Sequence, residues 1–125
     1  KKIGPQLKPE HTIVRVFNAT ETNGVGRRAA TVLRANGFHV IKIGNAEKPE
    51  NGLRIVGFKK DSPEVVLVAG QFKNPTVVAD GRADHSVDIY IGKGYTGFKE
   101  PPLASVAVKN GEACLPTLPS SGASG

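Results

Sequence analysis

Between residues 12 and 46 the chain passes through an apolar strand, a glycine-containing loop, an amphipathic helix and a second strand. In the first strand, Val14 and Val16 point to one side while Arg15 and Phe17 point to the other, because side chains alternate along a strand. The helix spans about residues 23–36, and its positions 25, 29, 32 and 33 form one apolar face. Such a strand–helix–strand unit limits the folds open to the rest of the chain.

A second unit of the same kind follows a loop that is rich in turn-forming residues. We predict strands at 38–43, 53–58, 76–79 and 87–91, and a second helix from about 61 to 73. Asp61 and Glu64 have the spacing of a capping box, and Pro63 is tolerated in a first helical turn. The β-branched segment that follows also fits a strand, but the start signals and Phe72, one heptad after Val65, favour a helix.

The predicted order is therefore strand, helix, strand, strand, helix, strand, strand. Two right-handed crossovers place both helices on one face of a mixed sheet. We expect an α+β fold of split, ferredoxin-like βαββαβ(β) type, in which the other sheet face carries no helix. The expected domain covers residues 12–98, between an N-terminal linker (1–11) and a Pro/Gly/Ser-rich tail (99–125).

Composition narrows the classes of partner. The 125 residues suffice for one domain with its own core. The 17 lysines and arginines exceed the 11 acidic residues, giving a net charge of +6. This balance favours an anionic partner such as nucleic acid, acidic lipid or a phosphate-bearing polymer, or it serves solubility alone.

Cysteine, histidine and apolar patterns exclude several other classes. A single cysteine, Cys114, allows no internal disulfide and no cysteine-based zinc site. The three histidines lack metal-ligand spacing, so we predict no metal and no cofactor. No apolar run approaches the roughly 20 residues of a membrane span. The polar start at Lys1 fits a fragment cut downstream of a targeting or membrane segment.

Catalytic chemistry is not expected. Asp84, His85 and Ser86 share residue types with a catalytic triad, but neighbours on an extended chain point apart, whereas triad members meet in space. The sequence offers no separate oxyanion hole. We therefore predict that the protein is not an enzyme.

Two surfaces are candidates for binding. At the first helix start, glycines and free amides lie beside arginines and can hold an anion, or form only a tight turn with a solvated basic face. The residues are Asn23, Gly24, Gly26, Arg27, Arg28 and Arg34. On the helix-free sheet face, aromatic and arginine side chains can stack sugars or bases. The residues are Arg15, Phe17, Arg54, Phe58 and Tyr90. We expect the apolar tail stretch at 103–108 to cover this second surface, because soluble domains rarely leave a patch as large as one sheet face exposed.

Several motifs resemble the LytR C-terminal domain. They are Val16-Phe17-Asn18, Asn23-Gly24-Val25-Gly26, Ala29-Ala30, Gly37-Phe38-His39-Val40, Ile43-Gly44-Asn45-Ala46 and the closing strand 87–90. The resemblance covers residues 12–95. The chain departs from the family pattern in two places: the first loop is longer than the usual Asn-Gly-Thr turn, and the third strand lacks a Thr-x-Ile-x-Tyr pattern.

The resemblance implies an exported module of Gram-positive, especially actinobacterial, cell envelopes, secreted or membrane-anchored. Such modules follow the phosphotransferase domain of LytR-CpsA-Psr proteins or stand alone behind a membrane anchor, which here would lie upstream of Lys1. The phosphotransferase domain, with its arginine-rich pyrophosphate site, is absent from these residues. We expect a non-catalytic module that supports envelope integrity by binding a cell-wall glycopolymer, peptidoglycan or an envelope-assembly protein.

Two other classes remain open. Ferredoxin-like sheets with aromatic and arginine residues also occur in RNA-binding domains, but the strand at 53–58 has a single aromatic residue, which disfavours nucleic acid as a partner. A purely structural or dimerisation module, pairing through an exposed edge strand, is the remaining alternative.

Overall fold

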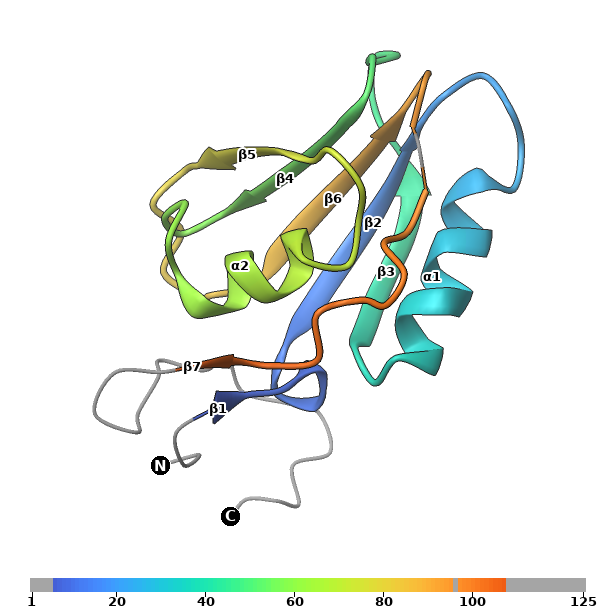
Figure 1. Ribbon diagram of the computed structural model, residues 1–125. Helices are drawn as coiled ribbons and strands as arrows, with labels where there is room; N and C mark the ends of the chain where they lie inside the picture. Colours follow the sequence, from blue (N-terminus) through green and yellow to red (C-terminus); the bar gives the residue numbers. More distant parts are fainter. Residues whose placement is uncertain (1–5, 96, 108–125) are drawn as a thin grey trace.

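The computed structural model describes residues 6–95 and 97–107. Two helices and five strands form the body of the fold (Figure 1): β2 (Ile13–Ala19), α1 (Val25–Ala35), β3 (His39–Asn45), β4 (Leu53–Gly57), α2 (Pro63–Ala69), β5 (Thr76–Ala79) and β6 (Val87–Gly92). A short β1 (Gln6–Leu7), a 3-10 turn η1 (Pro9–His11) and β7 (Val106–Ala107) complete the described elements. None of the described helices is long and apolar enough to cross a membrane.

The main sheet has the strand order β3-β2-β6-β4-β5. β4 and β6 are antiparallel, and the other neighbouring strands are parallel. The predicted α+β class, with a mixed sheet and two helices, is confirmed and is compatible with a ferredoxin-like type of fold. The split arrangement is not found, because each helix connects two adjacent strands, β2 to β3 and β4 to β5, and β6 joins the two units.

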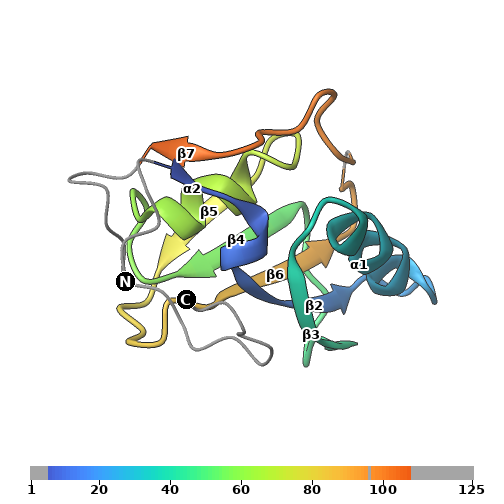
Figure 2. The ribbon, with the colours of Figure 1, turned by 90° about the horizontal axis from the view of Figure 1, so that it is seen from below.

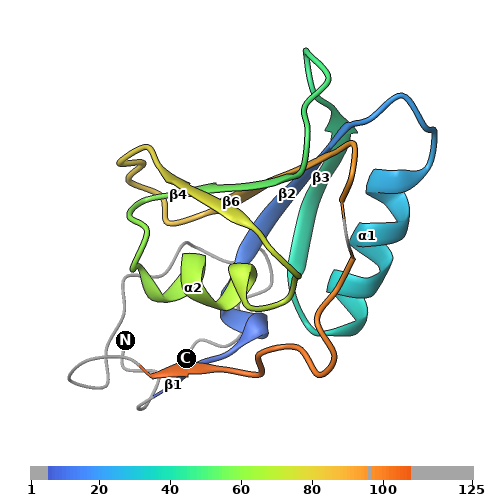
Figure 3. The same ribbon diagram turned by 45° about the horizontal axis from the view of Figure 1, so that its top comes forward.

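Both helices pack on the same face of the sheet (Figure 2). Gly26 of α1 lies against Asn18 of β2, and Gly57 of β4 lies against Val65 of α2. As predicted, the side chains under the helices are fully buried, and the same core cluster joins residues from all the central strands: Val14, Val16, Ile55, Val87, Ile89 and Ile91. Figure 3 shows α2 against β4 and α1 against β2 and β3.

The helical face of α1 differs in one position from the prediction. Ala29 and Leu33 are buried as expected, but Val32 is 38% exposed. Gly26 and Ala30 make the remaining close contacts instead. Because α1 lies at the β3 edge of the sheet, a side chain such as Val32 that does not point directly at the sheet is exposed to solvent.

The predicted second helix is confirmed, but its ends differ. Ser62, not Asp61, is the N-cap residue, and its Oγ accepts a hydrogen bond from the backbone N–H of Lys59 at 3.0 Å. Glu64 does not return to the cap, because its carboxylate lies 2.9 Å from Nδ1 of His85. The helix ends at Ala69, and the next residues bond to a segment further along the chain.

That segment, residues 97–107, is termed the return segment. It runs beside the C-terminal end of α2, where the N–H of Leu103 donates to the carbonyl of Gly70 at 3.0 Å. A Cβ on Gly70 would lie 2.6 Å from Leu103, so glycine is needed for this close approach. The side chain of Gln71 donates to the carbonyl of Leu103 at 2.7 Å. These bonds explain why α2 ends early.

The return segment also pairs with the N-terminal region. β7 forms an antiparallel pair with β1 next to α2 (Figures 1 and 2). Leu7, in the region expected to be a linker, is fully buried in the core. The expectation that the apolar tail covers the open sheet face is wrong for residues 103–107, which lie on the helix side. Residue 108 lies outside the described residues.

Candidate functional site

One half of the helix-free sheet face is an ion-pair network. Arg15 donates to Ser86 Oγ at 2.9 Å and to Asp88 at 3.1 Å, and its second NH group lies 3.7 Å from Asp84. Arg82 joins the same network through Asp88 at 3.1 Å and a bidentate contact with the nearby Asp80. Two arginines thus meet three carboxylates, so this part of the face offers no surplus positive charge.

Hydrogen bonds in this network shift the pKa values of Asp80, Arg82 and Asp84. Backbone and side-chain donation from Ser86 lowers the pKa of Asp84 below its usual value. The Arg82 guanidinium lowers the pKa of Asp80 and its own pKa is raised by the same hydrogen bond. Asp80, Arg82 and Asp84 therefore stay ionised near neutral pH.

The other half of the face is a row of stacked side chains. Phe17 and Tyr90 stack with ring centroids 4.9 Å apart, and the Arg54 guanidinium covers the other face of Tyr90 at 4.1 Å. Lys42 lies 5.8 Å from the Phe17 centroid on the opposite flank. Arg54 is in turn held by a bidentate pair with Glu50, at 2.7 and 2.9 Å, which lowers the pKa of that carboxyl. Tyr90 thus lies between Phe17 and Arg54, while Lys42 is more distant from the outer face of Phe17.

The structure therefore places four of the five predicted residues together on this face, and each of the four already has a partner within the protein. Arg15 and Arg54 are both ion-paired, and the rings of Phe17 and Tyr90 stand against each other. Phe58 lies apart and packs edge-on against His85 at 4.8 Å. The charges of Arg15 and Arg54 are therefore neutralised, whereas Lys42 at the end of the row is exposed and has no acidic partner among the described residues.

The Asp84-His85-Ser86 sequence forms no relay. The His85 ring binds the buried carboxylate of Glu64, while Ser86 Oγ donates to Asp84 at 2.7 Å. The His85 and Ser86 side chains thus serve different partners, as expected for neighbours on an extended chain.

On the exposed side of α1, by contrast, the arginine side chains have no described acidic partner. Arg27, Arg28 and Arg34 are exposed, and none of them forms an ion pair with a described carboxylate. The other three arginines of the chain, at 15, 54 and 82, are all ion-paired. Arg34 also donates to the carbonyl of Val40 at 3.0 Å. Positions 27 and 34 are seven residues apart, so they lie on the same side of the helix. We call these three residues the α1 arginine surface.

The loop before α1 is ordered by Asn18. Its side-chain amide donates to the carbonyl of Thr22 at 2.9 Å, and its carbonyl oxygen accepts from the backbone N–H of Thr20, also at 2.9 Å. Gly24 takes the N-cap position with φ of 86°, a conformation that favours glycine. Asn23 and Gly24 are exposed, whereas Gly26 is buried against Asn18 and Ile43. Of the predicted helix-start residues, Gly26 thus has a packing role.

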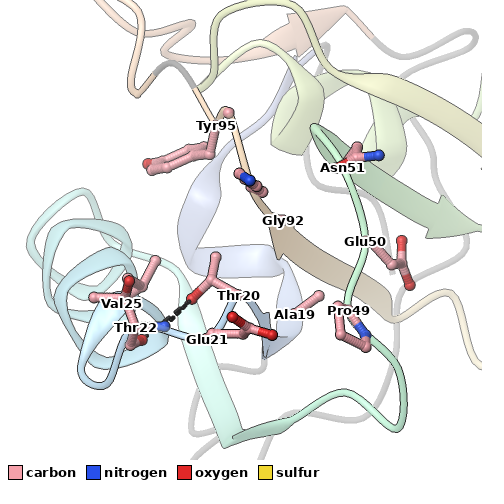
Figure 4. A pocket seen from close by; sticks show the side chains of 12 residues that line it. Ala19, Thr20, Glu21, Thr22, Val25, Pro49, Glu50, Asn51, Gly92 and Tyr95 are labelled. Carbon is pink, nitrogen blue, oxygen red and sulfur yellow. Dashed lines mark hydrogen bonds between the residues drawn. The ribbon is translucent and has the colours of Figure 1, made fainter.

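A crevice of about 580 Å³ opens beside this loop (Figure 4). Three separate segments line it: the β2–α1 connection, the end of the β3–β4 loop and the residues after β6. The lining residues are Ala19, Thr20, Glu21, Thr22, Val25, Pro49, Glu50, Asn51, Gly92, Lys93, Gly94 and Tyr95. Sequence analysis did not identify this crevice, because its walls come from segments up to about 70 residues apart; glycines 92 and 94 after a strand were the only local signal.

A family model described as LytR cell envelope-related transcriptional attenuator (LytR_C) matches residues 12–95. The chain belongs to this family. The matched residues run from the start of β2 to Tyr95 and so include α1, the Asn18 loop and the crevice walls. The predicted resemblance is confirmed, and the family description associates this LytR_C domain with the cell envelope.

A solved structure has a similar fold. It is the soluble domain of a conserved hypothetical secreted protein from Mycobacterium marinum, with a TM-score of 0.64 and 25% sequence identity. The alignment covers 78% of this chain and 68% of the other. No curated protein matches this LytR_C domain.

Proposed function

We propose that this LytR_C domain is a non-catalytic, extracytoplasmic module of the bacterial cell envelope, and that it binds an anionic cell-wall glycopolymer through the α1 arginine surface. The observation that carries this proposal is the distribution of ion pairs. Three arginines are neutralised on or beside the sheet face, while the three on α1 have no described acidic partner. Unpaired guanidinium groups bind phosphate and carboxylate in bidentate geometry.

Family membership and the secreted neighbour support the envelope location. The net charge of +6 also favours an anionic partner over a neutral one. Peptidoglycan and envelope-assembly proteins are the other ligands expected from the resemblance.

The test is co-sedimentation of the purified 125-residue chain with isolated cell walls. The double variant Arg27→Glu/Arg28→Glu should bind at least about tenfold more weakly, because it replaces attraction by repulsion at the contact. A matched control, Lys60→Glu/Lys99→Glu, makes the same change in net charge at exposed residues away from α1. Equal binding by wild type and the arginine variant would refute the site, and equal loss in both variants would show only a dependence on net charge.

Self-association through an edge strand is a second candidate function. β3 is at the end of the sheet order, and it exposes Ile41 by 49% and Ile43 by 37%. An edge strand has unpaired backbone groups that can pair with another strand. Light scattering of wild type and Ile41→Lys tests this candidate: a dimer that the substitution dissociates would support it, and a monomeric wild type would exclude it.

Nucleic acid is the weaker alternative, because the stacked row covers the ring faces that bases would need. A filter-binding titration across salt concentrations provides the test. Phosphate contacts would give a steep fall in affinity with salt.

A further inference from the structure

The crevice lies at a position where α/β sheets bind ligands. It opens beyond the carboxyl ends of the parallel strands β2 and β6, between the loop that leads into α1 and the loop that leads into β4 (Figure 4). Its volume of about 580 Å³ falls within the range of small-molecule sites. It is distinct from the α1 arginine surface, since none of those three arginines lines it.

Backbone hydrogen bonds fix one wall of the crevice. The N–H of Gly52 donates to the carbonyl of Lys93 at 2.7 Å, and the N–H of Lys93 donates to the carbonyl of Glu50 at 2.8 Å. A Cβ on Gly92 would overlap the backbone of Glu50, so only glycine allows the two segments to come this close. The wall is therefore a rigid junction of two segments.

The opposite wall is fixed by side chains. Asn18 binds both ends of the short turn at 20–22, and Thr20 Oγ1 accepts the N–H of Thr22 at 3.1 Å (Figure 4). Because both walls are held by internal bonds, little conformational entropy is lost when a ligand binds.

Five polar side chains at the crevice make no hydrogen bond or ion pair within the described structure: Glu21, Thr22, Asn51, Lys93 and Tyr95. Glu50, by contrast, is held by Arg54. The free carboxylate and the free ammonium cancel, so the crevice carries no net charge to attract an anionic group. Burial raises the pKa of Tyr95 to about 12, which keeps its hydroxyl protonated as a donor.

We propose that the crevice binds an uncharged sugar unit. Amide, carboxylate and phenol groups are the partners that sugar hydroxyls need, and they are combined here with the apolar surfaces of Val25, Pro49 and the half-buried Tyr95 ring. A charged phosphate or sulfate has no such match in a crevice of zero net charge. The inference rests on the proposed function, because the crevice then holds the sugar units of the polymer whose charged groups contact α1.

The test uses NMR titration of the 15N-labelled 125-residue chain with chitotetraose, with maltotetraose and with inorganic polyphosphate. We expect at least one uncharged oligosaccharide to shift the amide signals of Asn51, Gly92 and Lys93 in a saturable way, and polyphosphate to leave them unchanged. Asn51→Ala and Tyr95→Phe should each weaken oligosaccharide binding roughly three- to tenfold, the effect of one lost hydrogen bond. Asn45→Ala, at an exposed asparagine outside the crevice, is the matched control and should bind as wild type.

The outcomes separate the two proposals. If neither oligosaccharide shifts these signals, or if polyphosphate shifts them instead, the crevice assignment is overturned, whatever the cell-wall assay shows. If the oligosaccharide binds but the Arg27/Arg28 variant sediments with walls as wild type does, the α1 arginine surface fails and the crevice stands. The 15N spectrum of each variant also reports whether it is folded, so a loss of binding is read only from folded protein.

Discussion

Phe17 stacks on Tyr90 across β2 and β6, with ring centroids 4.9 Å apart and planes inclined by 20°. The two residues are register partners on adjacent strands, and their separation is close to the strand spacing itself. The rings therefore stand upright on the sheet, with their edges toward solvent. Arg54 covers the outer face of Tyr90 at 4.1 Å, so the row packs three side chains from three neighbouring strands against one another.

The stack predicts energetic coupling between its two rings. In a double-mutant cycle of Phe17→Ala and Tyr90→Ala, the coupling free energy should be about 0.5–1.5 kcal/mol. Stacked aromatic pairs stabilise a fold by about this much in addition to the contribution of their buried area. Urea unfolding of the four proteins measures it. A control cycle of Phe17 with Phe58, which packs against His85 instead, should give coupling near zero. Equal coupling in the two cycles would contradict direct stacking.

Thr12 carries a buried hydroxyl without a described partner. The residue is fully buried, and its Oγ1 makes no hydrogen bond to a described residue. Thr12→Val keeps the shape and removes the polar atom, so the free energy of unfolding should rise by about 1 kcal/mol. Thr31→Val on α1 is a suitable comparison, because it removes the hydroxyl that donates to the carbonyl of Arg27 at an exposed site. A loss of stability in Thr12→Val would show that the hydroxyl has a partner.

The contact between β4 and α2 leaves no room for a side chain at Gly57. A Cβ there would overlap Val65, which is fully buried on α2. Gly57→Ala should therefore lower the free energy of unfolding by about 1–3 kcal/mol, the usual cost of overpacking. Gly44→Ala serves as control, because a Cβ at Gly44 meets its nearest neighbours at an ordinary 3.7 Å. Thermal unfolding of both variants is sufficient; equal melting temperatures would mean that α2 shifts freely.

Local patterns were sufficient to predict both helices and the five strands of the main sheet, but not the short elements β1, η1 and β7. The periodicity of β2 and α1 reports directly which side is buried, and the Asp-Ser-Pro-Glu start of α2 outweighed its β-branched composition. The strand order was not predictable in the same way. Whether β6 pairs beside β2 or elsewhere depends on contacts between residues about 70 positions apart, such as Phe17 with Tyr90.

The site was harder to predict than the fold for the same reason. The sequence identifies arginines, but not which of them are neutralised; Arg15 and Arg27 look alike until the carboxylates of Asp84 and Asp88 are placed beside the first. Likewise, the sequence of the apolar tail stretch does not indicate that it packs beside α2. Gly70, the residue that admits Leu103, is recognisable only once the return segment is seen against α2.

The ion pairs of the sheet face predict a defined response to acid. The pKa values of Glu50, Asp80 and Asp84 are lowered in the folded protein, chiefly by hydrogen bonds from Arg54, Arg82 and Ser86 respectively. A carboxylate with a lowered pKa stabilises the fold at pH values above its unfolded pKa, near 4. That contribution is lost as the pH falls through the lower folded value. Stability measured by urea unfolding should therefore decline from about pH 5 downward.

Arg82→Met isolates one part of this response. It removes the main cause of the lowered pKa of Asp80, so the decline in unfolding free energy between about pH 5 and pH 3 should become shallower than in wild type, whatever the change in stability at pH 7. Arg27→Met removes the same charge from an arginine without a described acidic partner and should keep the wild-type slope. If both variants keep the wild-type slope, the Arg82–Asp80 pair does not contribute to folding stability. A shallower slope in Arg82→Met alone would show that this pair stabilises the folded state.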